Sequence, residues 1–160
     1  QGFVAVTVKE GLDQYFEATT QTMIILVLLL GLGLRWVNLN QSLWLDEATQ
    51  LLLSQKTLYS IYFERGADFH PPLSYLLMHF WMMLGTSEPV LRLISVLVGV
   101  LTILVVYLLA REFLVKSTAL LASLLLAISP YHIYYSQEVR MYGLATLFAT
   151  LSSYFYLRFC

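Results

Sequence analysis

The chain has 160 residues, of which 59% are hydrophobic and only 12% are charged. Soluble domains carry about 25% charged residues, so this composition excludes an ordinary water-soluble enzyme. The formal net charge of -1 offers no basic surface for nucleic-acid phosphates. A single cysteine, Cys160, excludes an internal disulfide and a cysteine-rich zinc site. The chain begins with Gln1 and ends in an apolar stretch, so we expect it to be a piece of a longer protein.

Four apolar segments approach the length of a membrane span, which needs about 20 mostly apolar residues in a helix. Arg35 and Trp36, at the end of the first segment, are typical of an anchor at the membrane interface. We therefore predict an all-α, polytopic membrane protein with about four transmembrane helices. The segments are residues 22–37, 90–110, 118–135 and 141–159.

Residues 72–84 are free of charge, but as a helix they would be only about 20 Å long, too short to span comfortably. Residues 47–63 repeat apolar side chains at roughly helical spacing among polar ones. We predict that both segments form interfacial helices within a first external loop, residues 38–89. A second external loop covers residues 131–140.

The two sides of the predicted membrane protein carry similar numbers of Lys and Arg, so total charge assigns no orientation. The compact basic turn at residues 111–116 is the best cytoplasmic loop, because the positive-inside rule works best for short loops. This orientation places residues 1–21 in the cytoplasm as an amino-terminal segment. It places both longer loops outside.

Four polar clusters interrupt the apolar background: LWLDEA, DFHPPL, the lone Arg92, and YSQEVRMY. Ionisable groups at membrane depth are costly, so each cluster is a candidate for function. If residues 72–84 do not span, the first, second and fourth clusters lie on the same face of the membrane. We expect them to converge on one site.

Asp46 lies where an apolar approach gives way to a helical pattern, so we predict that it is the helix N-cap. The helix dipole would keep its carboxylate ionised. An ionised carboxylate within reach of a hydroxyl can act as a general base. The alternative is that Asp46 only caps the helix and that the neighbouring Glu47 is solvated.

His70 precedes two prolines, which hold it in an extended conformation where its imidazole could bind a phosphate. The alternative is an interfacial turn. Arg140 suits two-point capture of a phosphate, or it could simply pair with Glu138. Tyr142 and its neighbouring tyrosines are typical of an aromatic belt. The three isolated histidines suggest no dedicated zinc site.

Taken together, LWLDEA, FHPPLSYLL, SEPVLRLISVLVG and SPYHIYYSQEVRMYGL, in this order, resemble the GT-C superfamily of membrane glycosyltransferases. The resemblance is greatest to the branch of protein O-mannosyltransferases and lipid A aminoarabinose transferases, and it covers about residues 26–155. It implies that residues 22–160 are the amino-terminal part of a GT-C transmembrane module. The enzyme would move a sugar from a polyprenyl-phosphate donor to a hydroxyl of a protein, lipid or glycan acceptor. The site would face outward from the plasma membrane, and transfer would be inverting.

The resemblance also assigns roles to individual residues. It maps the catalytic aspartate, acting as general base, onto Asp46, with Glu47 beside it shaping the donor or acceptor site. It maps contacts to the donor phosphate onto Arg140, His70 and Arg92.

The sequence departs from this family in two ways. Mannosyltransferases place an aspartate shortly after the second arginine motif, whereas residues 141–145 contain no acid. Glu138 could substitute, and Tyr142 is a further auxiliary candidate. We assign no cofactor and no metal ligand, and a need for a divalent metal ion stays open. GT-C modules also have about seven spans, so we expect this portion alone to be inactive.

Two other functions stay open at this point. In a transporter or channel subunit, Glu138, Arg140 and Asp46 would line a polar path through the membrane. In a non-catalytic scaffold, the same clusters would only anchor helices.

Overall fold

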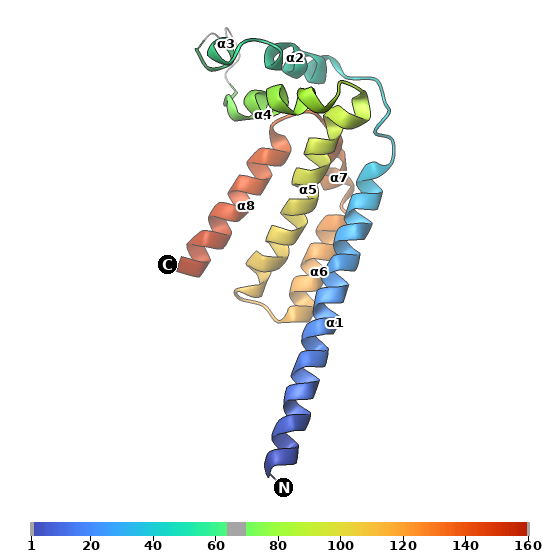
Figure 1. Cartoon of the computed structure of the whole chain (residues 1–160), viewed down its shortest axis with the longest axis vertical. Coiled ribbons are helices and arrows are strands. Elements are labelled where there is room, and N and C mark those ends of the chain that lie inside the picture. Colours follow the sequence, from blue (N-terminus) through green and yellow to red (C-terminus); the bar gives the residue numbers. More distant parts are fainter. Residues whose placement is uncertain (1, 64–69, 160) are drawn as a thin grey trace.

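The computed structural model describes residues 2–63 and 70–159, and all regular structure in these ranges is helical, which confirms the all-α prediction. The elements are α1 (Gly2–Trp36), α2 (Leu45–Ser54), α3 (Leu58–Phe63), α4 (Leu73–Trp81), the 3₁₀ turn η1 (Met82–Leu84), α5 (Glu88–Arg111), α6 (Lys116–Ala127), α7 (Pro130–Gln137) and α8 (Tyr142–Phe159). The described ranges hold eight α-helices and one 3₁₀ turn, and the short helices that cross the bundle lie between the long helices α1 and α5 in the chain (Figure 1).

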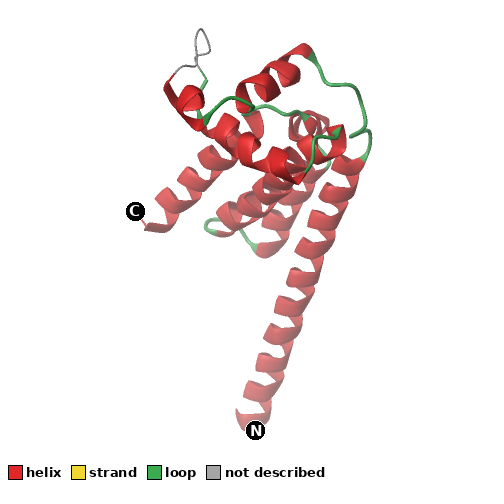
Figure 2. Ribbon diagram, turned by 45° about the horizontal axis from the view of Figure 1, so that its top comes forward, coloured by secondary structure: helices red, strands yellow, loops and turns green. Residues whose placement is uncertain are grey.

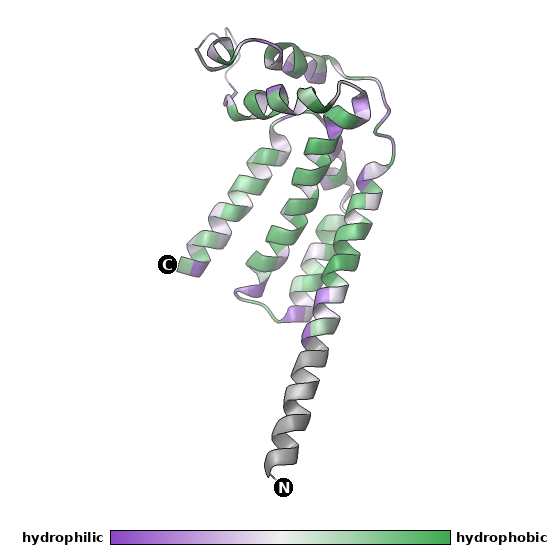
Figure 3. Ribbon diagram, viewed as in Figure 1, coloured by the Kyte–Doolittle hydropathy of each residue, from purple (hydrophilic) through white to green (hydrophobic). Residues whose placement is uncertain are grey.

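Helix α5 is the centre of the bundle, because α1, α6, α7 and α8 all pack against it. Two stretches are long and apolar enough to cross a membrane: Glu17–Trp36 of α1, with mean hydropathy 1.7, and Glu88–Arg111, with mean hydropathy 2.9. Helices α6 and α7 meet at an angle of 58° and together make a third span if counted as one. Figure 3 shows apolar residues along these helices and polar ones mainly toward their ends.

The fourth predicted span forms helix α8, but α8 is not among the described helices that are apolar enough to cross a membrane. Its Thr, Ser and Tyr side chains and its terminal Arg158 lower its hydropathy. The described part of the chain therefore offers two to three spans rather than four.

The bend between α6 and α7 coincides with Pro130, as expected for a residue that removes a helical hydrogen bond. The hydroxyl of Ser129 caps α7 by accepting the backbone N–H of His132. The break leaves carbonyls at the end of α6 without partners in their own helix.

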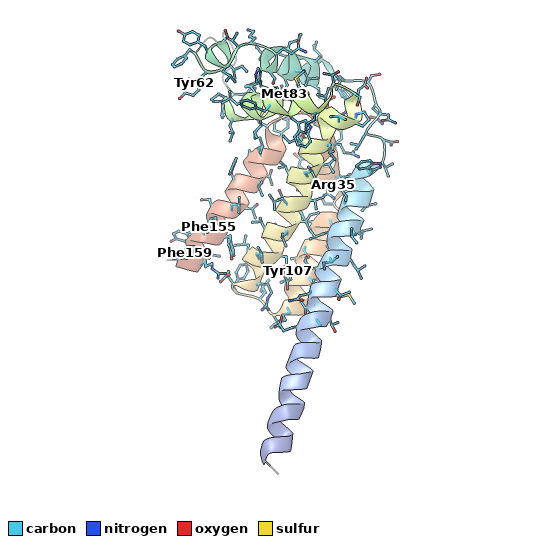
Figure 4. All side chains as sticks on the ribbon, viewed as in Figure 1. Arg35, Tyr62, Met83, Tyr107, Phe155 and Phe159 are labelled. Atoms are coloured by element: carbon cyan, nitrogen blue, oxygen red, sulfur yellow. The ribbon has the colours of Figure 1, made fainter. Side chains whose placement is uncertain are left out.

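Arg35 fills this gap, which corrects the prediction that it anchors α1 at the membrane interface. Its side chain is fully buried (Figure 4). It donates to the carbonyls of Gly31 at 2.8 Å and of Ala127 at 3.1 Å, and to Nδ1 of His132 at 2.5 Å. Arg35 therefore joins α1 to both halves of the bent pair.

Helices α2, α3 and α4 form a layer across one end of the bundle (Figures 1 and 2). The apolar segment Leu73–Leu84 is shorter than a span, in agreement with the prediction for residues 72–84. The predicted helix at residues 47–63 is instead two helices, α2 and α3.

A small hydrophobic core holds this crossing layer on the bundle. It is formed by Leu51 of α2, Met78 of α4, Leu91 of α5 and Val139, all buried. Val139 belongs to the connection between α7 and α8. The first polar cluster and the fourth are thereby brought to the same end of the bundle.

Candidate functional site

The first turn of α2 presents two adjacent carboxylates in opposite environments. The sequence predicted Asp46 as the N-cap of this helix. Helix α2 instead starts at Leu45, so its N-cap is Trp44. The third helical residue, Glu47, accepts a hydrogen bond from the backbone N–H of Trp44 at 3.1 Å. Its side chain therefore reaches back to the N-cap residue, as in a capping box. Asp46 is in the second position of the helix, with its side chain 74% exposed.

Glu47 is buried, so the alternative that it is solvated is wrong. Its Oε1 accepts Nε of Arg92 at 3.1 Å and the N–H of Val139 at 2.9 Å. Its Oε2 accepts Nη2 of Arg92 at 2.7 Å. One carboxylate therefore joins α2, α5 and the α7–α8 connection.

These bonds keep Glu47 ionised. Burial by itself raises the pKa of a carboxyl group, but the hydrogen bonds from Arg92, Val139 and Trp44 and the charge of Arg92 outweigh it. The pKa of Glu47 is therefore lowered from its ordinary value.

Arg92 is as fully engaged as Glu47. Besides the two bonds to Glu47, its Nη1 donates to the carbonyls of Leu39 at 2.9 Å and Gln41 at 2.6 Å. Its Nη2 also donates to the carbonyl of Ser42 at 3.3 Å. Because a guanidinium has five N–H donors, none is left for a phosphate. The geometry therefore does not support the prediction that Arg92 binds the donor phosphate, and it makes Arg92 a support of the first loop.

Asp46 and Arg140 come together although they are 94 positions apart in the sequence. Nη1 of Arg140 donates to the backbone carbonyl of Asp46 at 3.3 Å, and its Nη2 lies 3.9 Å from Oδ2 of the same residue. The Arg140 side chain is only 11% exposed. Among the described residues, Arg140 thus pairs with Asp46, whereas the alternative drawn from the sequence was a pair with Glu138.

These two side chains border a hollow of about 290 Å³ with a charged and aromatic wall. The guanidinium of Arg140 lies 5.8 Å from the centre of the Tyr142 ring. The ring of Tyr142 meets that of Tyr135 edge to face at 5.2 Å. The lining residues are Trp44, Leu45, Asp46, Glu47, Tyr134, Tyr135, Glu138, Arg140 and Tyr142.

Five of the seven predicted site residues line this hollow, and Arg92 and His70 do not. Of these two, Arg92 supports the first loop, as described above. His70 lies, partly buried, just before α4. The remaining start of its cluster, Asp68 and Phe69, is outside the described residues.

Sequence reasoning missed Tyr134 and Tyr135 as parts of the site, because it assigned them to an aromatic belt. Tyr134 precedes Glu138 by four positions, which is the spacing that places two side chains on one side of a helix. That spacing was the available signal. Within the ranges that the structure describes, no three His, Cys, Asp or Glu side chains form a group that could hold a metal ion.

The decisive comparison is with protein families, where a family model described as dolichyl-phosphate-mannose-protein mannosyltransferase matches residues 69–160. The chain belongs to this family. The matched part contains Arg92, Glu138, Arg140 and Tyr142, whereas Asp46 and Glu47 precede it.

A relative described as an uncharacterized protein, from Aquifex aeolicus (strain VF5), is 35% identical over 131 residues. The alignment covers 78% of this chain but 25% of the relative, so the chain spans about a quarter of that protein's length. No solved structure matches the chain.

Proposed function

We propose that the full-length parent protein transfers a sugar from a polyprenyl-phosphate donor to an acceptor hydroxyl, and that the hollow is part of its active site. The observation that carries this proposal is the position of Asp46, an exposed carboxylate 3.9 Å from the largely buried guanidinium of Arg140. One group can accept a proton, and the other can hold an anion. A sugar phosphodiester needs both.

Arg140 is the proposed ligand of the donor phosphate. Its contact to the Asp46 carboxylate is long, so an incoming phosphate oxygen can replace it at small cost. The phosphate gains negative charge as it leaves the sugar. A fixed cation therefore stabilises the transition state more than the bound donor, which is the requirement for catalysis.

Asp46 is the proposed general base. The acceptor hydroxyl gives its proton to the carboxylate while its oxygen bonds to the anomeric carbon. The bond from that carbon to the phosphate oxygen breaks, and polyprenyl phosphate leaves with the electron pair. Attack from the side opposite the phosphate makes the transfer inverting. Asp46 is in the first turn of α2, where the positive end of the helix dipole favours a negative charge.

Glu47 and Arg92 are proposed to position the site and not to react. All five donors of Arg92 and both carboxylate oxygens of Glu47 are engaged. Their effect on transfer would come through the placement of α2, and hence of Asp46. We keep Tyr142 and Glu138 as auxiliary residues of the hollow wall, and His70 as a proposed phosphate contact from the start of α4.

The hollow is proposed to face outward from the plasma membrane. The connection between α5 and α6, at the other end of the bundle, is short and is flanked by Arg111 and Lys116 (Figure 1). Short basic loops favour the cytoplasmic side. The crossing layer with Asp46 would then be external.

Sugar transfer by the full-length protein tests this proposal. Proteoliposomes containing it are supplied with a panel of labelled polyprenyl-phosphate sugars and with protein, lipid and glycan acceptors, with and without EDTA. The proposal predicts labelled product from at least one donor, with inverted anomeric configuration. Retained configuration would contradict the direct displacement. Solute flux without any transfer would favour a transporter.

A further inference from the structure

A second, smaller cavity lies on the inner side of Arg140, between the crossing layer and the bundle. Its volume is about 20 Å³. It is lined by Gln50 of α2, Ser74, Leu77 and Met78 of α4, Ile94, Ser95 and Val98 of α5, Val139 and Arg140 of the α7–α8 connection, and Gly143 and Leu144 of α8.

Three of the lining residues carry a buried polar atom with no hydrogen-bond partner among the described residues: Oε1 of Gln50, Oγ of Ser74 and Nε of Arg140. Gln50 is 2% exposed and Ser74 is 7% exposed. Leaving a buried polar group unpaired is costly, so three such groups on residues around one cavity indicate a shared partner.

The chemistry of the three atoms defines that partner. The amide oxygen of Gln50 only accepts, Nε–H of Arg140 only donates, and a serine hydroxyl does either. The partner must therefore donate and accept at the same atom. A phosphate or carboxylate oxygen cannot donate to Gln50, and a cation cannot accept from Arg140. A water oxygen satisfies all three.

The size of the cavity agrees with this chemistry. A water needs a cavity of roughly 10–15 Å³ and two to four polar partners. At about 20 Å³, the cavity has room for a water oxygen. A hydroxyl on a ligand would also have to bring its carbon framework past the surrounding Met78 and Val139, which belong to the hydrophobic core.

We propose that this cavity is a structural water site, and that Gln50 and Ser74 position Arg140 through the bound water. The guanidinium would be fixed on both sides: Nε by the water inside, and Nη1 by the carbonyl of Asp46 at the hollow. Fixing it before the donor arrives reduces the entropy lost on binding. The water site stands on its own, whereas its effect on donor binding rests on the proposed role of Arg140.

A density map of the full-length protein without ligand, at a resolution that shows ordered water, tests the site directly. The proposal predicts one oxygen-sized peak within hydrogen-bond distance, about 2.6–3.2 Å, of all three atoms. No peak, or a peak that appears only when a donor or acceptor is bound, would overturn it. This result is independent of whether the protein transfers a sugar.

Kinetics test the positioning role. Gln50→Met and Ser74→Ala should each raise KM for the polyprenyl-phosphate donor about tenfold, with kcat changed less than threefold. Ser54→Ala is the matched control, because this buried hydroxyl on α2 donates to the carbonyl of Gln50 and does not line the cavity. It should leave KM for the donor within twofold of wild type.

A double substitution separates positioning from simple loss of packing. Lysine has no Nε–H in the position of arginine's, so in an Arg140→Lys background Gln50→Met should raise KM less than twofold further. The same tenfold effect in both backgrounds, or no effect in either, would overturn the positioning role. Failure of every donor with wild type would refute the proposed function while leaving the density result decisive for the water.

Discussion

Glu47 and Arg92 form a buried two-point ion pair, with Nε at 3.1 Å from one carboxylate oxygen and Nη2 at 2.7 Å from the other. The pair connects the first turn of α2 to the first turns of the central helix α5. Since the neighbour of Glu47 is Asp46, the geometry of the exposed carboxylate depends on this buried one. The buried carboxylate that holds α2 in place and the exposed carboxylate of the proposed site are thus neighbours in the sequence.

Removing the Glu47 carboxylate should destabilise the protein strongly. Glu47→Ala leaves the guanidinium of Arg92 buried without its counter-charge. Such a loss lowers the free energy of unfolding by about 3–5 kcal/mol. Thermal unfolding of the purified full-length protein in detergent measures this as a lower Tm. Glu88→Gln, at an exposed position of α5, is the control and should change Tm little. Equal Tm values for both variants would show that the ion pair between Glu47 and Arg92 does not stabilise the fold.

The same carboxylate should make stability depend on pH. The pKa of Glu47 is lower in the folded protein than its ordinary value of 4.5, so its stabilising effect is fully present above that value. The effect is lost as the pH falls through 4.5 toward the folded-state pKa. The difference in Tm between wild type and Glu47→Gln should therefore be constant from pH 6 to 8 and shrink below about pH 4.5. A difference that grows on acidification would contradict the lowered pKa.

Helix α5 should tolerate no side chain at Gly99. An added Cβ would overlap Oγ of Ser136 and lie 2.6 Å from its Cβ, with Nε of Arg35 at 3.2 Å. Gly99→Ala should therefore push α7 away from α5 and lower stability by about 1–3 kcal/mol.

Gly33→Ala is the matched control for Gly99→Ala, because a Cβ there meets nothing within 4 Å. It should leave Tm unchanged or raise it, since alanine favours helix more than glycine does. The two variants can be compared by thermal unfolding in the same detergent. An unchanged Tm for Gly99→Ala would contradict the close contact between α5 and α7.

Arg140 should control donor affinity through the shape of its side chain as well as its charge. Arg140→Lys keeps the charge but loses the planar donor pair, so we expect KM for the donor to rise about tenfold. Arg140→Ala should also lower kcat, by roughly 10²–10³-fold, because a cation at the leaving phosphate is lost. Arg158→Ala, in the last turn of α8, is the control and should leave both constants within twofold. Normal KM and kcat for Arg140→Ala would contradict the proposal that Arg140 binds the donor phosphate.

The sequence predicted those parts of the fold that follow from length and apolar runs. The span in α5, the bend near Pro130 and the short helix after His70 all come from local composition. The approach of Asp46 to Arg140 also followed, since a non-spanning segment 72–84 leaves their clusters on the same side.

The errors arose where a long-range contact decides the role of a side chain. Arg35 next to Trp36 has the same local sequence whether it reaches the interface or a carbonyl 92 positions away. Glu47 next to Asp46 gives no local sign that one carboxylate is buried and the other exposed. The partners of both residues became known only from the packed helices.

Asp46 is the proposed base that deprotonates the acceptor hydroxyl. This role is tested by transfer of labelled sugar by the full-length protein with Asp46→Asn, beside wild type and Glu112→Gln. Glu112 is the control because it pairs with Arg158 at the end of the bundle away from the hollow. Loss of a general base predicts a kcat about 10²–10⁴-fold below wild type, with normal membrane insertion and Tm. Near-normal turnover by Asp46→Asn would contradict the role of Asp46 as general base.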